Sequence, residues 1–243
     1  MTGIYRLAER TIEITTLFPE THALCAAYRA EGEADFSVRT AQADIDFERV
    51  KSAREAELEG RAPYAWPEDY LETLAVYRQI AEKLPDYDSV LFHGSCLAVD
   101  GAGYLFTAKS GTGKSTHARL WRELLGERAV MVNDDKPLLR ITAEGVFAYG
   151  TPWDGKHRLS ANISVPLRAL CVLERAEENR IEPITVSQAY PMLLQQVYRP
   201  ADPAALAKTL ALIDRLAENV KLFRLGCNME TEAARLAYES MRG

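Results

Sequence analysis

The sequence predicts an α/β fold in which a mixed sheet carries flanking helices. Three observations support this fold class. Residues 104–107 are apolar and lead through a glycine-containing loop into a helical pattern, in the order strand, loop, helix. A second apolar strand ends in two aspartates, Asp134 and Asp135. Further apolar strands alternate with amphipathic helical patterns toward the end of the chain.

The loop at residues 108–116 reads Ala-Lys-Ser-Gly-Thr-Gly-Lys-Ser-Thr, which matches a phosphate-binding P-loop except at its first residue. Gly111 and Gly113 let successive N–H groups point into one concavity at the start of a helix, where unpaired donors favour an anion. Lys114 can reach terminal phosphates, and the Ser115 hydroxyl suits Mg²⁺. Alanine at position 108 requires a negative φ. The predicted nucleotide-binding residues are Ser110, Gly111, Thr112, Gly113, Lys114, Ser115 and Thr116, with Lys156 from a later loop.

Composition and charge limit the class of protein. The 243 residues are 47% hydrophobic with a net charge of −6, which suits one large domain or two small ones and argues against general nucleic-acid binding. No run of about 18 apolar residues is present, so no membrane span is expected. Four dispersed cysteines without a CxxC pair, and no apolar signal-peptide region at the N-terminus, predict a cytoplasmic protein with reduced thiols.

Residues 1–87 are predicted to form a small mixed α+β lobe. Alternation around residues 12–14 indicates a strand, and residues 36–39 and 43–47 suggest two more. A charged, helix-favouring stretch follows and is broken by prolines. Apolar residues at helical spacing between residues 69 and 84 then predict a helix that leads into the core.

Residues 88–243 are predicted to form a P-loop core with C-terminal helices. Residues 89–99 and 104–108 indicate an antiparallel hairpin that turns at residues 100–103. Residues 129–132 are the next strand of a parallel crossover, so Asp134 and Asp135 should lie at the same sheet edge as the loop. The remaining predicted elements are a hairpin (138–141, 146–149), strands at 169–174 and 220–225, helices at 187–198 and 204–218, and a final helix capped by Asn228.

Asp134 and Asp135 are the candidate acidic residues. At this edge one carboxylate can hold Mg²⁺ while the other takes a proton from an attacking hydroxyl, and the residues alone leave the order open. The loop at residues 150–158 carries Lys156, His157 and Arg158. These basic side chains could lie over a triphosphate or grip a phosphoryl acceptor, or the loop could be a surface turn.

The hairpin carrying His93-Gly94, the Ser-Gly-Thr-Gly-Lys-Ser loop and the strand ending in Asp134-Asp135 together resemble the HPr kinase/phosphorylase family. That family belongs to the phosphoenolpyruvate-carboxykinase-like P-loop fold, and the match covers roughly residues 89–175. Residues 150–156 look like those of small HPr-kinase-related proteins of bacteria.

The resemblance implies a role for each site residue. Lys114 would hold the β- and γ-phosphates, Ser115 and Asp135 the Mg²⁺, and Asp134 would accept the proton. His93 would orient or tune the carboxylate; without the resemblance, a structural histidine is the first interpretation. The segment with which the family binds HPr is not recognisable in this sequence, and the extra ligand residues of the carboxykinases cannot be placed. Neither HPr as the substrate nor a carboxykinase reaction is therefore expected.

The sequence hypothesis is an ATP- and Mg²⁺-dependent kinase that phosphorylates a hydroxyl group, with GTP or pyrophosphate left open as the donor. A serine of a protein or peptide is the first expected acceptor, and a small hydroxylated metabolite is the second. The rival hypotheses are a regulator that binds ATP without chemistry and a hydrolase that couples ATP cleavage to motion. No nucleic-acid or membrane partner is expected, and a homo-oligomer is compatible with the resemblance.

Overall fold

A computed structural model of the protein describes residues 1–58, 60–155 and 157–243. The chain divides into two compact units, Met1–Lys83 (unit 1) and Leu84–Gly243 (unit 2). The sequence placed the division slightly later, between residues 87 and 88, at the end of the short 3₁₀ helix η2 (Leu84–Tyr87).

Unit 1 is built on a three-stranded sheet in the order β1-β2-β3. β1 and β2 are antiparallel, and β3 runs parallel to β2. The strands are β1 (Thr2–Leu7), β2 (Arg10–Thr15) and β3 (Phe36–Arg39), and the helices are α1 (Glu20–Leu24), η1 (Ala26–Tyr28), α2 (Gln42–Leu58) and α3 (Glu68–Lys83). The unit is fixed internally by the buried Glu72 carboxylate of α3, which accepts hydrogen bonds from the N–H groups of Leu17 (2.7 Å) and Phe18 (2.8 Å) and from the Thr40 hydroxyl (2.6 Å).

The strand predicted at residues 43–47 is wrong, because these residues form the beginning of α2. Five residues of alternating polarity fit a strand and the exposed face of a helix equally well. Only Ile45 of this stretch is buried, while Phe47 is 53% exposed, as one face of a helix requires. β1 and α1 were not predicted.

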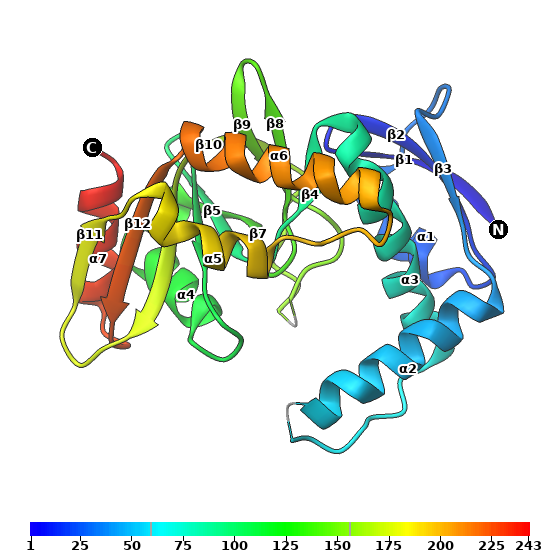
Figure 1. Cartoon of the computed structure of the whole chain (residues 1–243), viewed down its shortest axis with the longest axis horizontal. Coiled ribbons are helices and arrows are strands. Elements are labelled where there is room, and N and C mark those ends of the chain that lie inside the picture. Colours follow the sequence, from blue (N-terminus) through cyan, green and yellow to red (C-terminus); the bar gives the residue numbers. More distant parts are fainter. Residues whose placement is uncertain (59, 156) are drawn as a thin grey trace. The chain divides into compact units, whose positions relative to one another are not determined.

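Unit 2 is built on a nine-stranded mixed sheet (Figure 1). Its main path is β4-β8-β9-β10-β6-β5-β7, and β12 lies beside β10 with β11 at its other side. The early part of β10 pairs with β9, and the later part with β6 and β12, so one long strand joins both parts of the sheet. The strands are β4 (Ser89–Leu91), β5 (Ser95–Val99), β6 (Ala102–Thr107), β7 (Ala129–Asn133), β8 (Leu138–Thr142), β9 (Gly145–Tyr149), β10 (Ser164–Arg175), β11 (Arg180–Pro183) and β12 (Lys221–Cys227).

The predicted antiparallel hairpin before the loop is confirmed as β5–β6. β7 is antiparallel to β5, so it runs parallel to β6 with β5 between them. The carboxyl ends of β6 and β7 therefore lie at the same edge, as the crossover predicted. The helix between them, α4 (Lys114–Leu125), is followed by η3 (Gly126–Arg128).

The single strand predicted over residues 89–99 is wrong, because the chain breaks there into β4 and β5. β4 pairs with β8, whereas β5 pairs with β6 and β7. In the break, the His93 N–H donates to the Gln196 carbonyl (2.8 Å) and the Gly94 N–H donates to the Asp135 carbonyl (3.0 Å). The break therefore places His93 beside the residues that follow β7.

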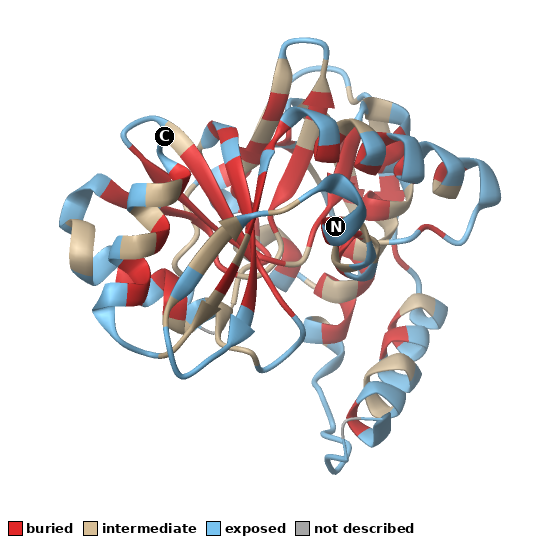
Figure 2. Cartoon of the chain, turned by 60° about the vertical axis from the view of Figure 1, so that its left-hand side comes forward, coloured by how far each residue is buried: buried red, intermediate tan, exposed pale blue. Residues whose placement is uncertain are grey.

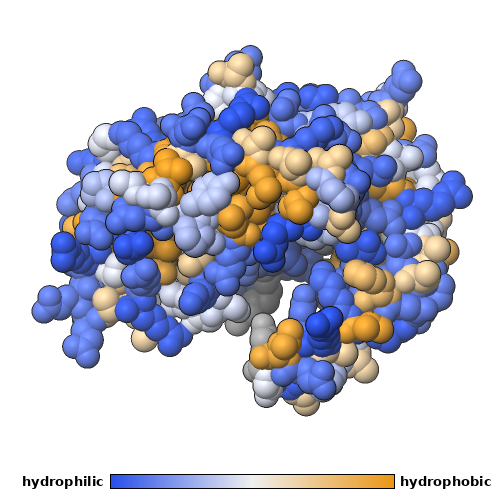
Figure 3. Space-filling model, in the orientation of Figure 1, coloured by the Kyte–Doolittle hydropathy of each residue, from blue (hydrophilic) through white to orange (hydrophobic). Residues whose placement is uncertain are grey.

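Apolar side chains fill both faces of the sheet, and Figure 2 shows its strands as largely buried. One cluster joins the sheet to α5 (Val186–Gln196) and α6 (Pro203–Asn219), and the other joins it to α4 and α7 (Thr231–Met241). Apolar side chains also reach the surface over α5 and α6, where Val186 and Leu210 are partly exposed (Figure 3). Of the described helices, none has the length and apolarity needed to cross a membrane.

Two smaller predictions concern the cysteines and the last helix. All four cysteines are free, and burial raises the pKa of Cys25 and Cys96 to about 12, so these thiols stay protonated. The predicted cap of the final helix is wrong by two residues. Glu230 is the N-cap of α7, and Asn228 instead accepts a hydrogen bond from the Glu230 N–H (3.0 Å).

Candidate functional site

The loop between β6 and α4 turns at two glycines. Gly111 has φ 75° and Gly113 has φ 124°, and a Cβ atom at either position would meet no atom within 4 Å. The backbone conformation, rather than lack of space, therefore calls for glycine. Gly113 is the N-cap of α4 and has no side-chain cap, which leaves the N–H groups of the first turn available to an anion. Ala108 is buried and lies outside the positive-φ region, so alanine fits the first position of the loop.

Two cationic side chains bind backbone carbonyls of this loop. Lys114 Nζ donates to the Ala108 carbonyl (3.2 Å), and burial lowers the pKa of Lys114 while the charge of Asp135 opposes that shift. Arg175, the last residue of β10, donates to the carbonyls of Thr112 (3.4 Å) and Gly111. Sequence reasoning missed Arg175, although its place at the end of a predicted core strand was an available signal.

Asp134 directly follows β7, and its carboxylate is buried. The Gly155 N–H donates to Asp134 Oδ1 (2.6 Å), and the Ser95 hydroxyl donates to the Asp134 carbonyl (3.0 Å). A Cβ atom at Gly155 would lie 2.6 Å from Asp134 Oδ2, so any larger residue would have to displace this carboxylate. Burial raises the pKa of Asp134, and the negative charges of Asp154 and Asp135 raise it further. The hydrogen bond from the Gly155 N–H lowers this pKa, but its effect is smaller than that of burial.

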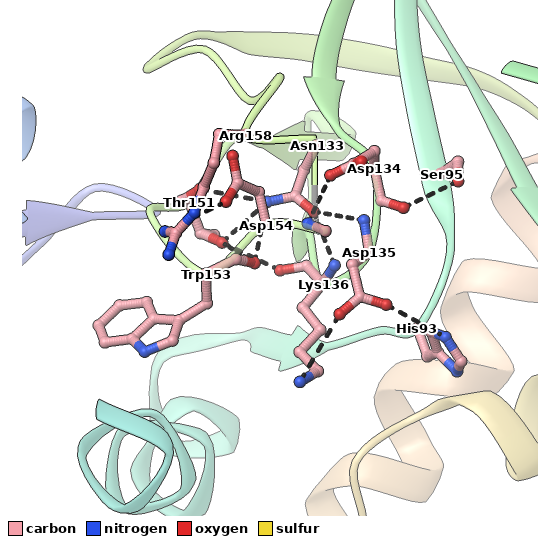
Figure 4. A network of polar contacts seen from close by, with 11 residues as sticks. His93, Ser95, Asn133, Asp134, Asp135, Lys136, Thr151, Trp153, Asp154 and Arg158 are labelled. Carbon is pink, nitrogen blue, oxygen red and sulfur yellow. Dashed lines mark hydrogen bonds and ion pairs between the residues drawn. The ribbon is translucent and has the colours of Figure 1, made fainter. Parts of the chain in front are cut away.

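Asp135 has different surroundings. His93 Nε2 lies 3.3 Å from Asp135 Oδ1 and Lys136 Nζ lies 3.6 Å from Oδ2, and Figure 4 shows both groups directed at this carboxylate. Burial alone would raise the pKa of Asp135, but His93, Lys136 and Lys114 together outweigh it and lower the pKa. Two adjacent carboxylates thus have pKa values displaced in opposite directions, a pattern that separates a proton acceptor from a permanent anion.

The turn that carries both aspartates is held by the buried side chain of Asn133. Its Oδ1 accepts hydrogen bonds from the N–H groups of Asp135 (2.9 Å) and Lys136 (2.6 Å), while its Nδ2 donates to the Thr151 carbonyl (3.2 Å) and hydroxyl (3.0 Å). Sequence reasoning missed Asn133. An asparagine at the start of a turn, directly after a strand, was the signal that could have found it.

The structure brings several predicted site residues together. Residues 110–116 form the loop and the first turn of α4, Asp134 and Asp135 follow β7, and His93 lies in the break between β4 and β5. His93 contacts Asp135, and Lys114 interacts electrostatically with the same carboxylate. Lys156 lies outside the described residues.

A pocket of about 490 Å³ lies beside α4 and the end of β7. Among the residues that line it are Ser115, Arg119, Arg122, Met131, Asp134 and His157. Ser115 of the loop motif and Asp134 of the acidic pair therefore border the same cavity.

The side chains at the site also indicate which metal ion they could bind. Within the described ranges, no group of three or more His, Cys, Asp or Glu side chains converges on one point. Zinc sites need such a group, whereas Mg²⁺ needs only one or two protein oxygens when phosphates and water supply the rest. An exposed hydroxyl at Ser115 and an anionic carboxylate at Asp135 fit Mg²⁺ with a bound nucleotide.

A family model described as "ScmC: SynChlorMet cassette protein ScmC" matches residues 65–229, which include every site residue discussed above. A search of curated proteins finds no match. The structure of the Hpr(Ser) kinase/phosphatase from Coxiella burnetii is similar with a TM-score of 0.33 and 14% identity, and the alignment covers 63% of this chain and 99% of that one.

Proposed function

The chain belongs to the ScmC family of SynChlorMet cassette proteins, and we propose that this member transfers the γ-phosphoryl group of ATP to a hydroxyl acceptor. The observation that carries the proposal is the pair of adjacent aspartates at the strand edge shared with the glycine turn and Lys114, where Asp134 accepts the Gly155 N–H and Asp135 contacts His93. A regulator that only binds ATP needs the turn and the lysine, but it has no use for a buried carboxylate of raised pKa.

On the donor side, the N–H groups of residues 110–116 would hold the phosphates, and Lys114 would neutralise the terminal ones. Arg175 would maintain the loop through its bonds to the carbonyls of residues 111 and 112. Mg²⁺ held by Ser115 and Asp135 would neutralise charge on the phosphates during transfer. Lys156 is proposed as a further nucleotide contact.

On the acceptor side, Asp134 would take the proton of the attacking hydroxyl. A carboxylate whose pKa is raised is a stronger base than an ordinary one, which suits that role. Its carboxylate is oriented by the Gly155 N–H. His93 would act on Asp135, because its contact keeps that carboxylate ionised. These contacts favour the order in which Asp134 is the base and Asp135 lies on the metal side.

The core is proposed to have the P-loop fold of the phosphoenolpyruvate-carboxykinase/HPr-kinase type. Support comes from the order of its parts: the β5–β6 hairpin precedes the loop, His93 stands before the hairpin, and the acidic pair ends the next parallel strand. The fold and the two aspartates do not distinguish between acceptors, so a serine of a protein or peptide and a small hydroxylated molecule are both proposed. A cytoplasmic location and a homo-oligomeric state also stay predictions.

The test uses γ-labelled ATP with Mg²⁺ and a desalted host extract, with and without its small-molecule fraction. We expect the wild-type protein to transfer label, and Lys114→Ala and Asp134→Asn to lose transfer, the latter by about 10²–10⁴-fold. Lys208→Ala is the matched control, because this α6 lysine is 56% exposed and pairs with the exposed Asp86.

The place of the label identifies the acceptor class: a macromolecular band means a protein or peptide, and label confined to the small-molecule fraction means a metabolite. Full transfer by either site variant would contradict the proposed function. ATP binding without transfer to any fraction would favour the regulator instead.

A further inference from the structure

The pocket beside the proposed transfer site has one wall formed by α4. Ser115, Arg119 and Arg122 are spaced by four and three residues, so they lie on one face of the helix. Asp134 and His157 line the same cavity, and Met131 adds a buried apolar side chain. A molecule in this pocket would therefore contact the proposed base and both arginines.

The charges in this pocket favour an anion. Two guanidinium groups and one carboxylate, that of Asp134, line the pocket. Arg119 shares its charge with Glu123 in an exposed ion pair. Arg122 makes no side-chain hydrogen bond or ion pair with another described residue. The guanidinium of Arg122 is therefore available to a ligand.

The spacing along α4 sets the size of that ligand. With a rise of about 1.5 Å per residue, Arg119 and Arg122 follow Ser115 by about 6 Å and about 10 Å along the helix axis. Helical side chains lean back toward the N-terminus, which brings the guanidinium groups nearer to Ser115 than these values. The pocket volume of about 490 Å³ is in the range of small-molecule sites. An acidic group within several ångströms of the reacting hydroxyl would fit.

We propose that the phosphoryl acceptor is a compact hydroxylated acid, whose hydroxyl lies at Asp134 and whose carboxylate or phosphate is bound by Arg119 and Arg122. This inference rests on the proposed kinase function and narrows its acceptor. In the reaction, the acceptor oxygen bonds to the γ-phosphorus as the bond from that phosphorus to the β–γ bridging oxygen breaks. The hydroxyl proton passes to Asp134, and ADP leaves.

The test compares molecules that differ mainly in the acidic group, with γ-labelled ATP and Mg²⁺. D-glycerate and glycerol differ by the carboxylate, glycerol 3-phosphate supplies a phosphate instead, and a serine-containing peptide represents the macromolecular acceptor. We expect label on one or both acids and little on glycerol or the peptide. Whichever acid is labelled identifies the anionic group that the arginines bind.

The arginines are tested by Arg119→Ala and Arg122→Ala, with Arg180→Ala as the control because that side chain on β11 is 83% exposed and outside the pocket. Each pocket variant should raise the KM for the labelled acid about tenfold or more, as expected for a lost charge-assisted hydrogen bond. The control should not. The Kd for ATP is measured for each variant in parallel, and thermal melting confirms that each is folded.

Equal labelling of glycerol and glycerate, or labelling of the peptide alone, would overturn the inference. It would also be overturned if the protein binds ATP but labels neither acid. A fourth contradicting result would be arginine variants that bind ATP more weakly while their KM for the acid is unchanged. The last would mean that the arginines serve the nucleotide. A wild-type protein that transfers no label to anything in the host extract would contradict the proposed function itself.

Discussion

At the scale of single residues, the surroundings of Asp134 have a consequence for stability. Its folded-state pKa lies above the value of about 3.9 for an unfolded aspartate, because burial disfavours the charged form. A raised carboxyl pKa stabilises the fold below the unfolded pKa, and this contribution is lost as the pH rises through the folded pKa. At neutral pH the ionised Asp134 therefore lowers the free energy of unfolding.

Asp134→Asn should consequently melt at a higher temperature than the wild type at pH 7.5, with a smaller gain at pH 4.5. Asparagine removes the charge and keeps an oxygen to accept the Gly155 N–H. Thermal melts of both proteins at the two pH values measure the difference. Asp46→Asn, at an exposed residue of α2, is the control for removing a carboxylate at the surface. A variant less stable than the wild type at pH 7.5 would contradict the raised pKa.

Gly155 offers a second test, because it contacts the proposed base, Asp134, but takes no part in the transfer itself. A methyl group at this position would lie 2.6 Å from Asp134 Oδ2, so Gly155→Ala must displace the carboxylate or the loop. Phosphoryl transfer should fall by about tenfold or more, while the Kd for ATP changes little. Gly243→Ala is the control, because its nearest neighbour would be 3.8 Å away. Unchanged transfer in Gly155→Ala would show that the position of Asp134 is not critical.

At the scale of elements, the sequence was most informative where local chemistry decides structure. The glycine loop, the β5–β6 hairpin and α3 follow from turn residues and apolar periods that act over short distances. The break at His93 could not be predicted, because it depends on bonds to Gln196 and Asp135, which are far along the chain. Arg175 could not be predicted as a site residue for the same reason, because its partners Gly111 and Thr112 lie far from it along the chain, in the connection between β6 and α4.

α4 has a glycine at each end, so substitutions at the two positions can distinguish a glycine needed for stability from one needed for phosphate binding. Gly113 at the N-terminal end has φ 124° and Gly126 at the C-terminal end has φ 58°, so alanine at either position costs about 1–3 kcal/mol of stability. Only Gly113 borders the proposed phosphate site. Gly113→Ala should therefore weaken ATP binding about tenfold or more, whereas Gly126→Ala should lower the melting temperature alone.

Calorimetric titration of both variants with ATP and Mg²⁺ measures this contrast. The wild-type protein gives the reference Kd, and thermal melts show whether the two substitutions are equally destabilising. Equal loss of ATP affinity in both variants would mean that affinity reports the stability of α4 rather than the shape of the loop.

At the scale of the whole molecule, every described residue of the candidate site belongs to unit 2. Both apolar clusters of the nine-stranded sheet are also formed within unit 2, from residues between Val90 and Met241. Unit 1 has its own sheet and its own buried anchor at Glu72. Each unit thus has the internal contacts that an independently folding domain needs.

Residues 84–243 expressed alone should therefore fold and bind ATP. Both clusters remain complete in this fragment, so its thermal unfolding should be cooperative, and its Kd for ATP should lie within about threefold of the full-length value. Circular dichroism melts and calorimetric titration measure the two properties, and Lys114→Ala in the same fragment controls for non-specific binding. A fragment that melts without a cooperative transition would show that unit 1 is required for the core to fold. A cooperative fragment without ATP binding would instead place part of the nucleotide site in unit 1.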